Sequence, residues 1–157
     1  MQSLEKQLFS LLKGKVLLFG IGNRMRADDG AGPLVVDKVK GRCRIECIDA
    51  GVAPENYLEK VVKAGPDTVL IVDAVDFNGR AGEIKILRNE ALSAGGISTH
   101  ALSLSLACEY LKNRIRGAGI VLVGIKPQNV SMGREMSAAV KRSVEKLAEA
   151  LVKEFAD

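Results

Sequence analysis

Two neighbouring aspartates, a third aspartate and a single histidine are the residues of this chain best suited to chemistry. Asp28 and Asp29 follow one apolar segment, Asp73 ends another, and His100 is the only histidine among 157 residues. Carboxylate oxygens and an imidazole nitrogen bind divalent metals, and the same groups act as general acids and bases. Asp29, Asp73 and His100 therefore form a plausible metal set that leaves positions open for water or substrate.

The same residues also have ordinary structural interpretations. Acids in the first turn of a helix are favourable by about 0.3–1 kcal/mol, so Asp28 and Asp29 suit a helix cap. Asp73 suits a turn at a strand end, and a lone histidine is commonly a core or capping residue. Residue types and spacing leave these roles and the metal site equally open. Asp76, one turn beyond Asp73, is an alternative ligand.

The elements that must position these residues follow from the apolar pattern. Continuous apolar segments are typical of strands covered on both faces, whereas alternation indicates a half-exposed strand near a sheet edge. We expect strands at 16–19, 43–48, 68–72, 82–87 and 120–125, the fourth being the alternating one. We expect helices at 3–13, from Gly30 onwards, at 54–63, from Thr99 or His100 to 114, and at 134–155.

Strands that alternate with helices predict an α/β protein, a three-layer α/β/α sandwich with a mainly parallel sheet. Ligands of such sheets bind in the crevice at the carboxyl ends of the parallel strands. Asp29 follows the first strand, Asp73 ends the third and His100 follows the fourth. We therefore expect all three side chains at one edge of the sheet.

Length and composition fit a single domain over residues 1–157 with an aliphatic core. The net charge is +4 with interspersed signs, and only 4% of residues are aromatic, which disfavours nucleic-acid binding. No apolar segment approaches the roughly 18 residues that span a bilayer, and the N-terminus lacks the features of a signal peptide. We therefore expect a cytoplasmic protein without a membrane partner. With no obvious interface stripe, we expect a monomer.

The three cysteines give little sign of chemistry. Cys43 and Cys47 share one face of the strand predicted at 43–48, and Cys108 falls in a predicted helix, two turns beyond His100. An odd count without a Cys-x-x-Cys motif argues against a disulfide framework. We interpret all three as small buried hydrophobic residues.

A nucleotide site is the main rival interpretation of the first loop. Gly20 and Gly22 fit a dinucleotide fingerprint, and Asp49 ends the second strand, where a ribose-binding acid would stand. The third glycine position is Met25, however, and the acidic pair would repel a pyrophosphate. A nucleotide-binding α/β domain remains an alternative on this pattern.

Seven segments in a fixed order carry a family resemblance. They read G-I-G-N at 20–23, D-D-G-A-G at 28–32, D-A-G-V-A-P-E-N at 49–56, L-I-V-D-A-V at 70–75, G-E-I-K-I-L at 82–87, S-T-H at 98–100 and V-G-I-K-P at 123–127. Over about residues 15–150 the chain resembles the [NiFe]-hydrogenase maturation endopeptidases, in the form that processes the large subunit of hydrogenase 3-type complexes. The helix expected within residues 1–14 lies outside this resemblance.

The resemblance implies an α/β/α sandwich on a five-stranded mixed sheet. It implies an endopeptidase that removes a short C-terminal extension from a [NiFe]-hydrogenase large-subunit precursor after nickel insertion. By motif position, Asp29, Asp73 and His100 would be both the metal ligands and the catalytic residues, with Asp28 a neighbour. The nickel would arrive with the precursor, and whether the resting enzyme holds a metal stays open. Ala50 and Val52 depart from the Gly and hydroxyl residue common in the family.

Two chemical routes fit these residues. The metal could polarise the scissile carbonyl or acidify a bound water, or Asp29 or Asp73 could act as a general base. A non-catalytic metallochaperone or docking module for the precursor is the alternative from a different functional class.

Overall fold

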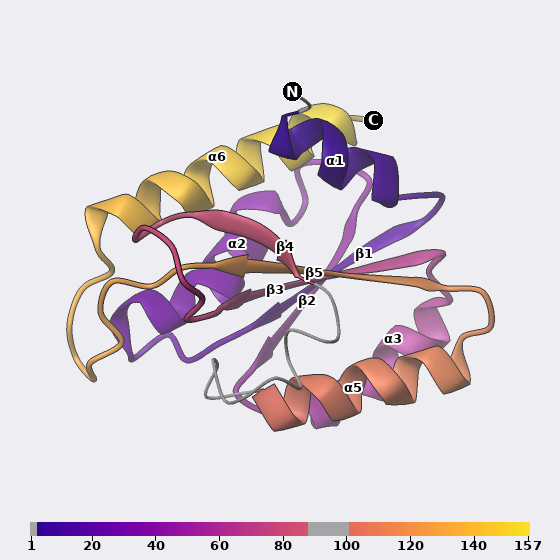
Figure 1. Ribbon diagram of the computed structural model, residues 1–157. Helices are drawn as coiled ribbons and strands as arrows, with labels where there is room; N and C mark the ends of the chain where they lie inside the picture. The colour runs from indigo at the N-terminus through magenta and orange to yellow at the C-terminus, as the bar shows by residue number, and fades with distance from the viewer. Residues whose placement is uncertain (1–2, 88–100) are drawn as a thin grey trace.

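Five strands among the described residues form one sheet through the centre of the protein (Figure 1). The computed structural model describes residues 3–87 and 101–157. The strand order is β2-β1-β3-β5-β4, and only β4 runs antiparallel to its neighbour. The bounds are β1 Val16–Ile21, β2 Glu46–Gly51, β3 Thr68–Ala74, β4 Ile84–Leu87 and β5 Gly119–Ile125. The predicted mixed, mainly parallel sheet with an alternating edge strand is confirmed.

Helices cover both faces of this sheet and complete the three predicted layers. Figure 1 shows α1, α2 and α6 on one face and α3 and α5 on the other. The bounds are α1 Leu4–Leu11, α2 Ala31–Val39, α3 Leu58–Ala64, α5 Ala101–Arg114 and α6 Ala138–Glu154, with short 3-10 turns at Ala27–Gly30 and Pro54–Asn56. In the described part of the chain, no helix is both long and apolar enough to cross a membrane.

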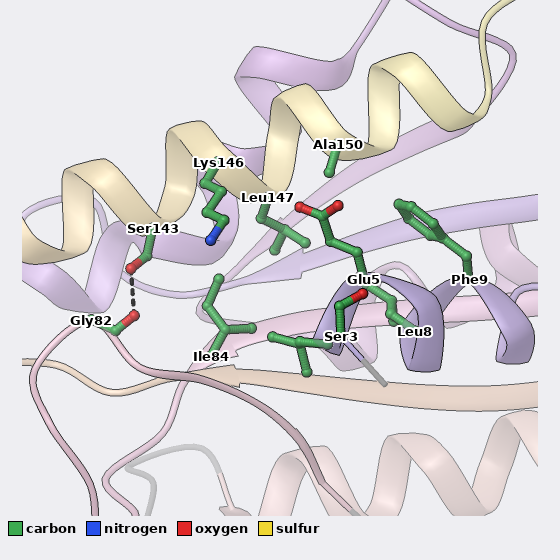
Figure 2. A pocket seen from close by; sticks show the side chains of 11 residues that line it. Ser3, Glu5, Leu8, Phe9, Gly82, Ile84, Ser143, Lys146, Leu147 and Ala150 are labelled. Carbon is green, nitrogen blue, oxygen red and sulfur yellow. Dashed lines mark hydrogen bonds between the residues drawn. The ribbon is translucent and has the colours of Figure 1, made fainter. Parts of the chain in front are cut away.

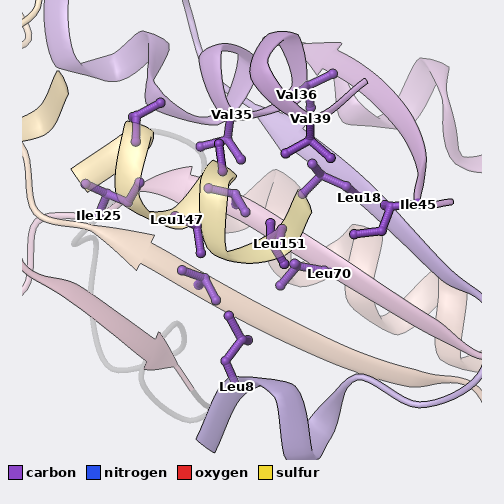
Figure 3. Packing of buried hydrophobic residues seen from close by; sticks show 14 of the residues in the cluster. Leu8, Leu18, Val35, Val36, Val39, Ile45, Leu70, Ile125, Leu147 and Leu151 are labelled. Atoms are coloured by element: carbon purple, nitrogen blue, oxygen red, sulfur yellow. The ribbon is translucent and has the colours of Figure 1, made fainter. Parts of the chain in front are cut away.

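The central strands are apolar throughout because each of their faces meets a layer of helices. Leu18 and Leu70 face the cluster under α1, α2 and α6, whereas Phe19 and Ile71 face the cluster under α3 and α5. Figure 3 shows the first of these clusters, in which Leu151 of α6 packs with side chains from α2 and the sheet. Full burial of an aliphatic side chain stabilises the fold by about 1.5–3 kcal/mol.

A glycine lets α2 begin directly over the sheet. A Cβ atom on Gly32 would lie 2.3 Å from the carbonyl oxygen of Ile21 and 2.4 Å from that of Val72. Only a residue without a side chain permits this approach. The turn that precedes α2 is thereby held against the carboxyl ends of β1 and β3.

The helix predicted at 54–63 is shorter, because Pro54–Asn56 form a 3-10 turn and α3 begins at Leu58. Two further predicted boundaries were wrong because of contacts distant in sequence. The second strand covers Glu46–Gly51 rather than 43–48, because the backbone N–H of Arg44 is committed to the carbonyl of Phe155. Cys43 therefore lies outside the strand and does not share a strand face with Cys47. Cys108 is buried, as predicted, whereas Cys43 and Cys47 are only half-buried and pack against the edge of the core.

The last helix begins four residues later than predicted. Ser137 is its N-cap, and its hydroxyl accepts the backbone N–H of Val140 at 3.3 Å. The segment at 134–137 belongs instead to the loop after β5, which is fixed by contacts with the first loop.

Candidate active site

Asp29 and Asp73 lie at the carboxyl edge of the sheet. Asp29 is in the 3-10 turn that follows β1, and Asp73 is the penultimate residue of the neighbouring strand β3. The turn contacts β3, and both carboxylates are buried. Burial of two acids costs free energy unless hydrogen bonds or a cation compensate. Buried acids at this edge are therefore candidates for function.

The backbone of the first loop orients the Asp29 carboxylate. Its Oδ2 accepts the N–H of Asn23 at 2.9 Å. The loop folds this tightly because Gly22, with φ of 153°, comes so close to the Asp29 carbonyl oxygen that a Cβ would lie 2.0 Å from it. A nucleotide pyrophosphate would need this loop interior, which backbone atoms and an acidic side chain occupy.

Asp28 has a structural role that differs from the role of Asp29. Its fully buried carboxylate accepts the backbone N–H groups of Gln128, Asn129 and Ser137 at 2.8, 3.0 and 2.7 Å, and the Ser137 hydroxyl at 2.9 Å. Its own N–H donates to the carbonyl of Asn129. Four donors match the lone-pair sites of an ionised carboxylate. Asp28 thus joins the first loop to the loop before α6.

Both aspartates lie in the first turn of a 3-10 helix, as the structural interpretation allowed, but neither is an N-cap. Neither the 3-10 turn of Asp28 and Asp29 nor α2 has a side-chain cap; Gly30 occupies the N-cap position of α2. Ala27, directly before the pair, has φ of 49°. A non-glycine residue in this left-handed region carries strain of about 1 kcal/mol or more. The strained turn brings both aspartates inward.

Arg24 fixes the same loop from outside. Its guanidinium donates to both carboxylate oxygens of Asp37 in α2, at 2.6 and 2.8 Å, and to Asp49 in β2 at 2.7 Å. Hydrogen bonding to the arginine lowers the pKa of Asp37, and its two acidic partners raise the pKa of Arg24. Asp49, the ribose-binding acid of the nucleotide interpretation, is therefore already engaged.

Two candidate ligands remain, His100 and Asp76. His100 lies outside the described residues, so its position in the set stays a prediction. Asp76 is 68% exposed at its side chain and pairs with Lys126 in solvent, unlike the buried Asp73. Within residues 3–87 and 101–157, no three His, Cys, Asp or Glu side chains are close enough to hold a metal ion.

A separate cavity of about 390 Å³ lies between α1, β4 and α6. Figure 2 shows Leu8, Ile84 and Leu147 at its wall, with Glu5 and Lys146 as its charged residues. The lining surface is mainly apolar and includes none of the aspartates of the sheet edge. The cavity is thus distinct from the candidate active site.

Fold and site together define a class of α/β protein with a pair of buried carboxylates at the carboxyl edge of a mixed sheet. The model of the hydrogenase maturation protease family, HycI, matches residues 34–154. The hydrogenase 3 maturation protease of Escherichia coli K12 is 34% identical over 134 residues, covering 82% of this chain and 83% of that protein.

Solved structures agree with this match. The [NiFe] hydrogenase maturation protease HycI from Thermococcus kodakarensis superimposes with a TM-score of 0.84 at 33% identity, covering 96% of this chain and 97% of the other. The endopeptidase HycI from Escherichia coli gives 0.77 at 30% identity, with 92% and 96% covered. The chain belongs to the hydrogenase maturation protease family, and it is an endopeptidase.

Proposed function

We propose that this endopeptidase removes the C-terminal extension of a [NiFe]-hydrogenase large-subunit precursor after nickel has been inserted. The observation that carries the proposal is the pair of buried acids, Asp29 and Asp73, at the carboxyl ends of adjacent strands in a protease of this family. The similar proteins from Escherichia coli and Thermococcus kodakarensis are named for hydrogenase 3 maturation and [NiFe] hydrogenase maturation.

Nickel enters this proposal as part of the substrate. Two carboxylates and the imidazole of His100 form an O,O,N donor set without thiolates, which is weaker for nickel than a sulfur-rich site. Such a set engages nickel that precursor thiolates already hold without extracting it. The metal thereby reports that the precursor is ready, and it places the scissile bond beside Asp29 and Asp73.

Hydrolysis then needs a base, an attacking water and a proton for the leaving amine. Either Asp29 or Asp73 accepts a proton from the water as it attacks the scissile carbonyl carbon. The C–N bond breaks, and the leaving nitrogen takes the proton. The N–H of Asn23 donates to Oδ2 of Asp29 and so fixes the direction in which this carboxylate presents its other oxygen.

Substitution of the three candidate residues tests these roles. Asp29→Ala, Asp73→Ala and His100→Ala should each lower the rate of peptide release at least about 100-fold, because each removes a general base or a ligand. Mass spectrometry of the precursor measures that rate, and circular dichroism checks that each variant is folded. Asp76→Ala is the matched control, an exposed acid close in sequence to Asp73 that should leave the rate unchanged. Cleavage by His100→Ala at the wild-type rate would refute the assignment.

A further inference from the structure

Three exposed apolar side chains lie in loops at the edge of the sheet that carries Asp29 and Asp73. Met25 in the loop after β1, Val52 after β2 and Met132 after β5 are 69%, 56% and 63% exposed. They are three of only five large apolar side chains classed as exposed in the described part of the chain. Single exposed apolar residues need no explanation, but a group beside a site often marks a contact surface.

Backbone hydrogen bonds join the three loops into one surface. The N–H of Gly133, next to Met132, donates to the carbonyl of Met25 at 2.8 Å. The N–H of Gly22 donates to the carbonyl of Gly51, next to Val52, at 2.9 Å. Met25, Val52 and Met132 are called the carboxyl-edge patch below. In Figure 1 the loops after β1 and β5 lie together at the left end of the molecule.

The loops under the patch are held by buried and bidentate contacts. The Asp28 carboxylate fixes the loop of Met132 through four hydrogen bonds, and Arg24 fixes the loop of Met25 to α2 and β2. The apolar side chains are therefore presented on a firm base rather than exposed by a loose loop. Methionine suits such a surface because its flexible thioether adapts to an irregular partner.

Two arginines of the first loop are engaged within the chain. Arg24 is paired with Asp37 and Asp49, and Nε of Arg26 donates to the carbonyl of Val130 at 3.1 Å. These arginines are thus held by the protein itself, whereas Arg134 and Glu135 of the loop after β5 are exposed. A partner recognised through the exposed apolar side chains presents an apolar surface of its own.

We infer that the carboxyl-edge patch docks an apolar segment of the hydrogenase large-subunit precursor beside the bond that is cut. The inference rests on the proposed function, because the precursor must reach Asp29 and Asp73 at this same edge. Docking there aligns the peptide before hydrolysis, so it lowers KM and leaves the chemical step to the carboxylates.

A triple variant separates docking from chemistry. Met25→Gln, Val52→Thr and Met132→Gln together keep the size of each side chain and remove its apolar character. KM for precursor processing should rise at least about tenfold, whereas kcat stays within about twofold. The ratio of the variant's KM to the wild-type KM should be the same at 50 and 500 mM salt, because the substitutions change no charge. Leu11→Gln is the control, since Leu11 is an exposed apolar residue on α1, at the other end of β1.

Three outcomes overturn the inference. One is an unchanged KM for the triple variant while the wild type cleaves. Another is an equal rise in KM for Leu11→Gln. The third is that light scattering shows a dimer for the wild type and a monomer for the triple variant, while KM is unchanged. The patch would then join two copies of this chain. If the wild type releases no peptide, the proposed function fails separately. Sedimentation of the precursor with each variant then decides whether the patch binds it.

Discussion

Asp28 and Asp29 show how far adjacent residues of one type can differ in role. Asp28 is surrounded by donors from a loop 100 residues away, and its oxygens are fully used in structure. Asp29 accepts one local backbone N–H, and its turn contacts β3. The sequence motif marks the pair as unusual. Only the partners in space distinguish Asp28, which joins two loops, from Asp29, the candidate ligand.

Removal of the Asp28 carboxylate should destabilise the fold strongly. Asp28→Ala leaves four donors without their acceptor in a buried place, and each costs about 1 kcal/mol or more, so we expect a loss of about 3–5 kcal/mol. The free energy of unfolding in urea measures the loss. Asp76→Ala, which removes an exposed carboxylate, should change it by less than about 0.5 kcal/mol. Equal effects of the two substitutions would contradict the structural role assigned to the Asp28 carboxylate.

Cys47 should be an unreactive thiol in the native protein. Burial raises its pKa to about 11, so that at pH 8 about one molecule in a thousand carries the thiolate. Alkylation of Cys47 by iodoacetamide should then be at least about 100-fold slower in native protein than in urea. Mass spectrometry of the Cys47 peptide over time gives both rates. Similar rates in the two states would show that burial does not protect this thiol.

At the scale of elements, the apolar pattern predicted the sheet well and its boundaries less well. Continuous apolar segments gave β1, β3 and β5, because strands buried on both faces leave a local signal. The start of α6 was missed because Ser137 is held by Asp28, more than 100 residues away. The role of Arg24 was missed for the same reason, since its partner Asp49 lies in another strand. Long-range polar contacts leave no periodic trace in the sequence.

The contact between α2 and the sheet should be intolerant of a single methyl group. Gly32→Ala places a Cβ within 2.4 Å of two backbone carbonyl oxygens, so α2 must shift, with a loss of about 3 kcal/mol. Gly119→Ala is the control, because its Cβ would meet only Thr68, at 3.9 Å. Thermal unfolding followed by circular dichroism compares the two. A Gly32→Ala variant as stable as Gly119→Ala would disprove the close approach.

The whole molecule places its candidate chemistry at one end of the sheet. Two apolar clusters hold the sheet from both faces, and the parallel order of β1 and β3 puts Asp29 and Asp73 at the same edge. That arrangement could be predicted, since it follows from chain order in an α/β fold. The partners of each acid could not, and the role of His100 stays a prediction.

Paired surface carboxylates should make the stability of the whole molecule fall in acid. Hydrogen bonds to arginines lower the pKa of Asp37 and Glu149, and bonds from Tyr110 and Arg114 lower that of Glu59. Their stabilisation is complete above the unfolded pKa of about 4 and is lost as the pH falls through the lowered folded values. The combined Asp37→Asn, Glu59→Gln and Glu149→Gln variant should therefore lose less stability than wild type between pH 5 and 2.5. Parallel curves for the two proteins would contradict this.

The mass of a hydrogenase large-subunit precursor after incubation with this protein tests the central claim most directly. The precursor is prepared with nickel, confirmed by elemental analysis, and separately without it. The account predicts that the nickel-loaded precursor alone loses its C-terminal peptide, and that Asp73→Ala leaves it intact. An intact nickel-loaded precursor after incubation with the wild type would contradict the account, and a stable complex with that intact precursor would indicate a docking protein or metallochaperone.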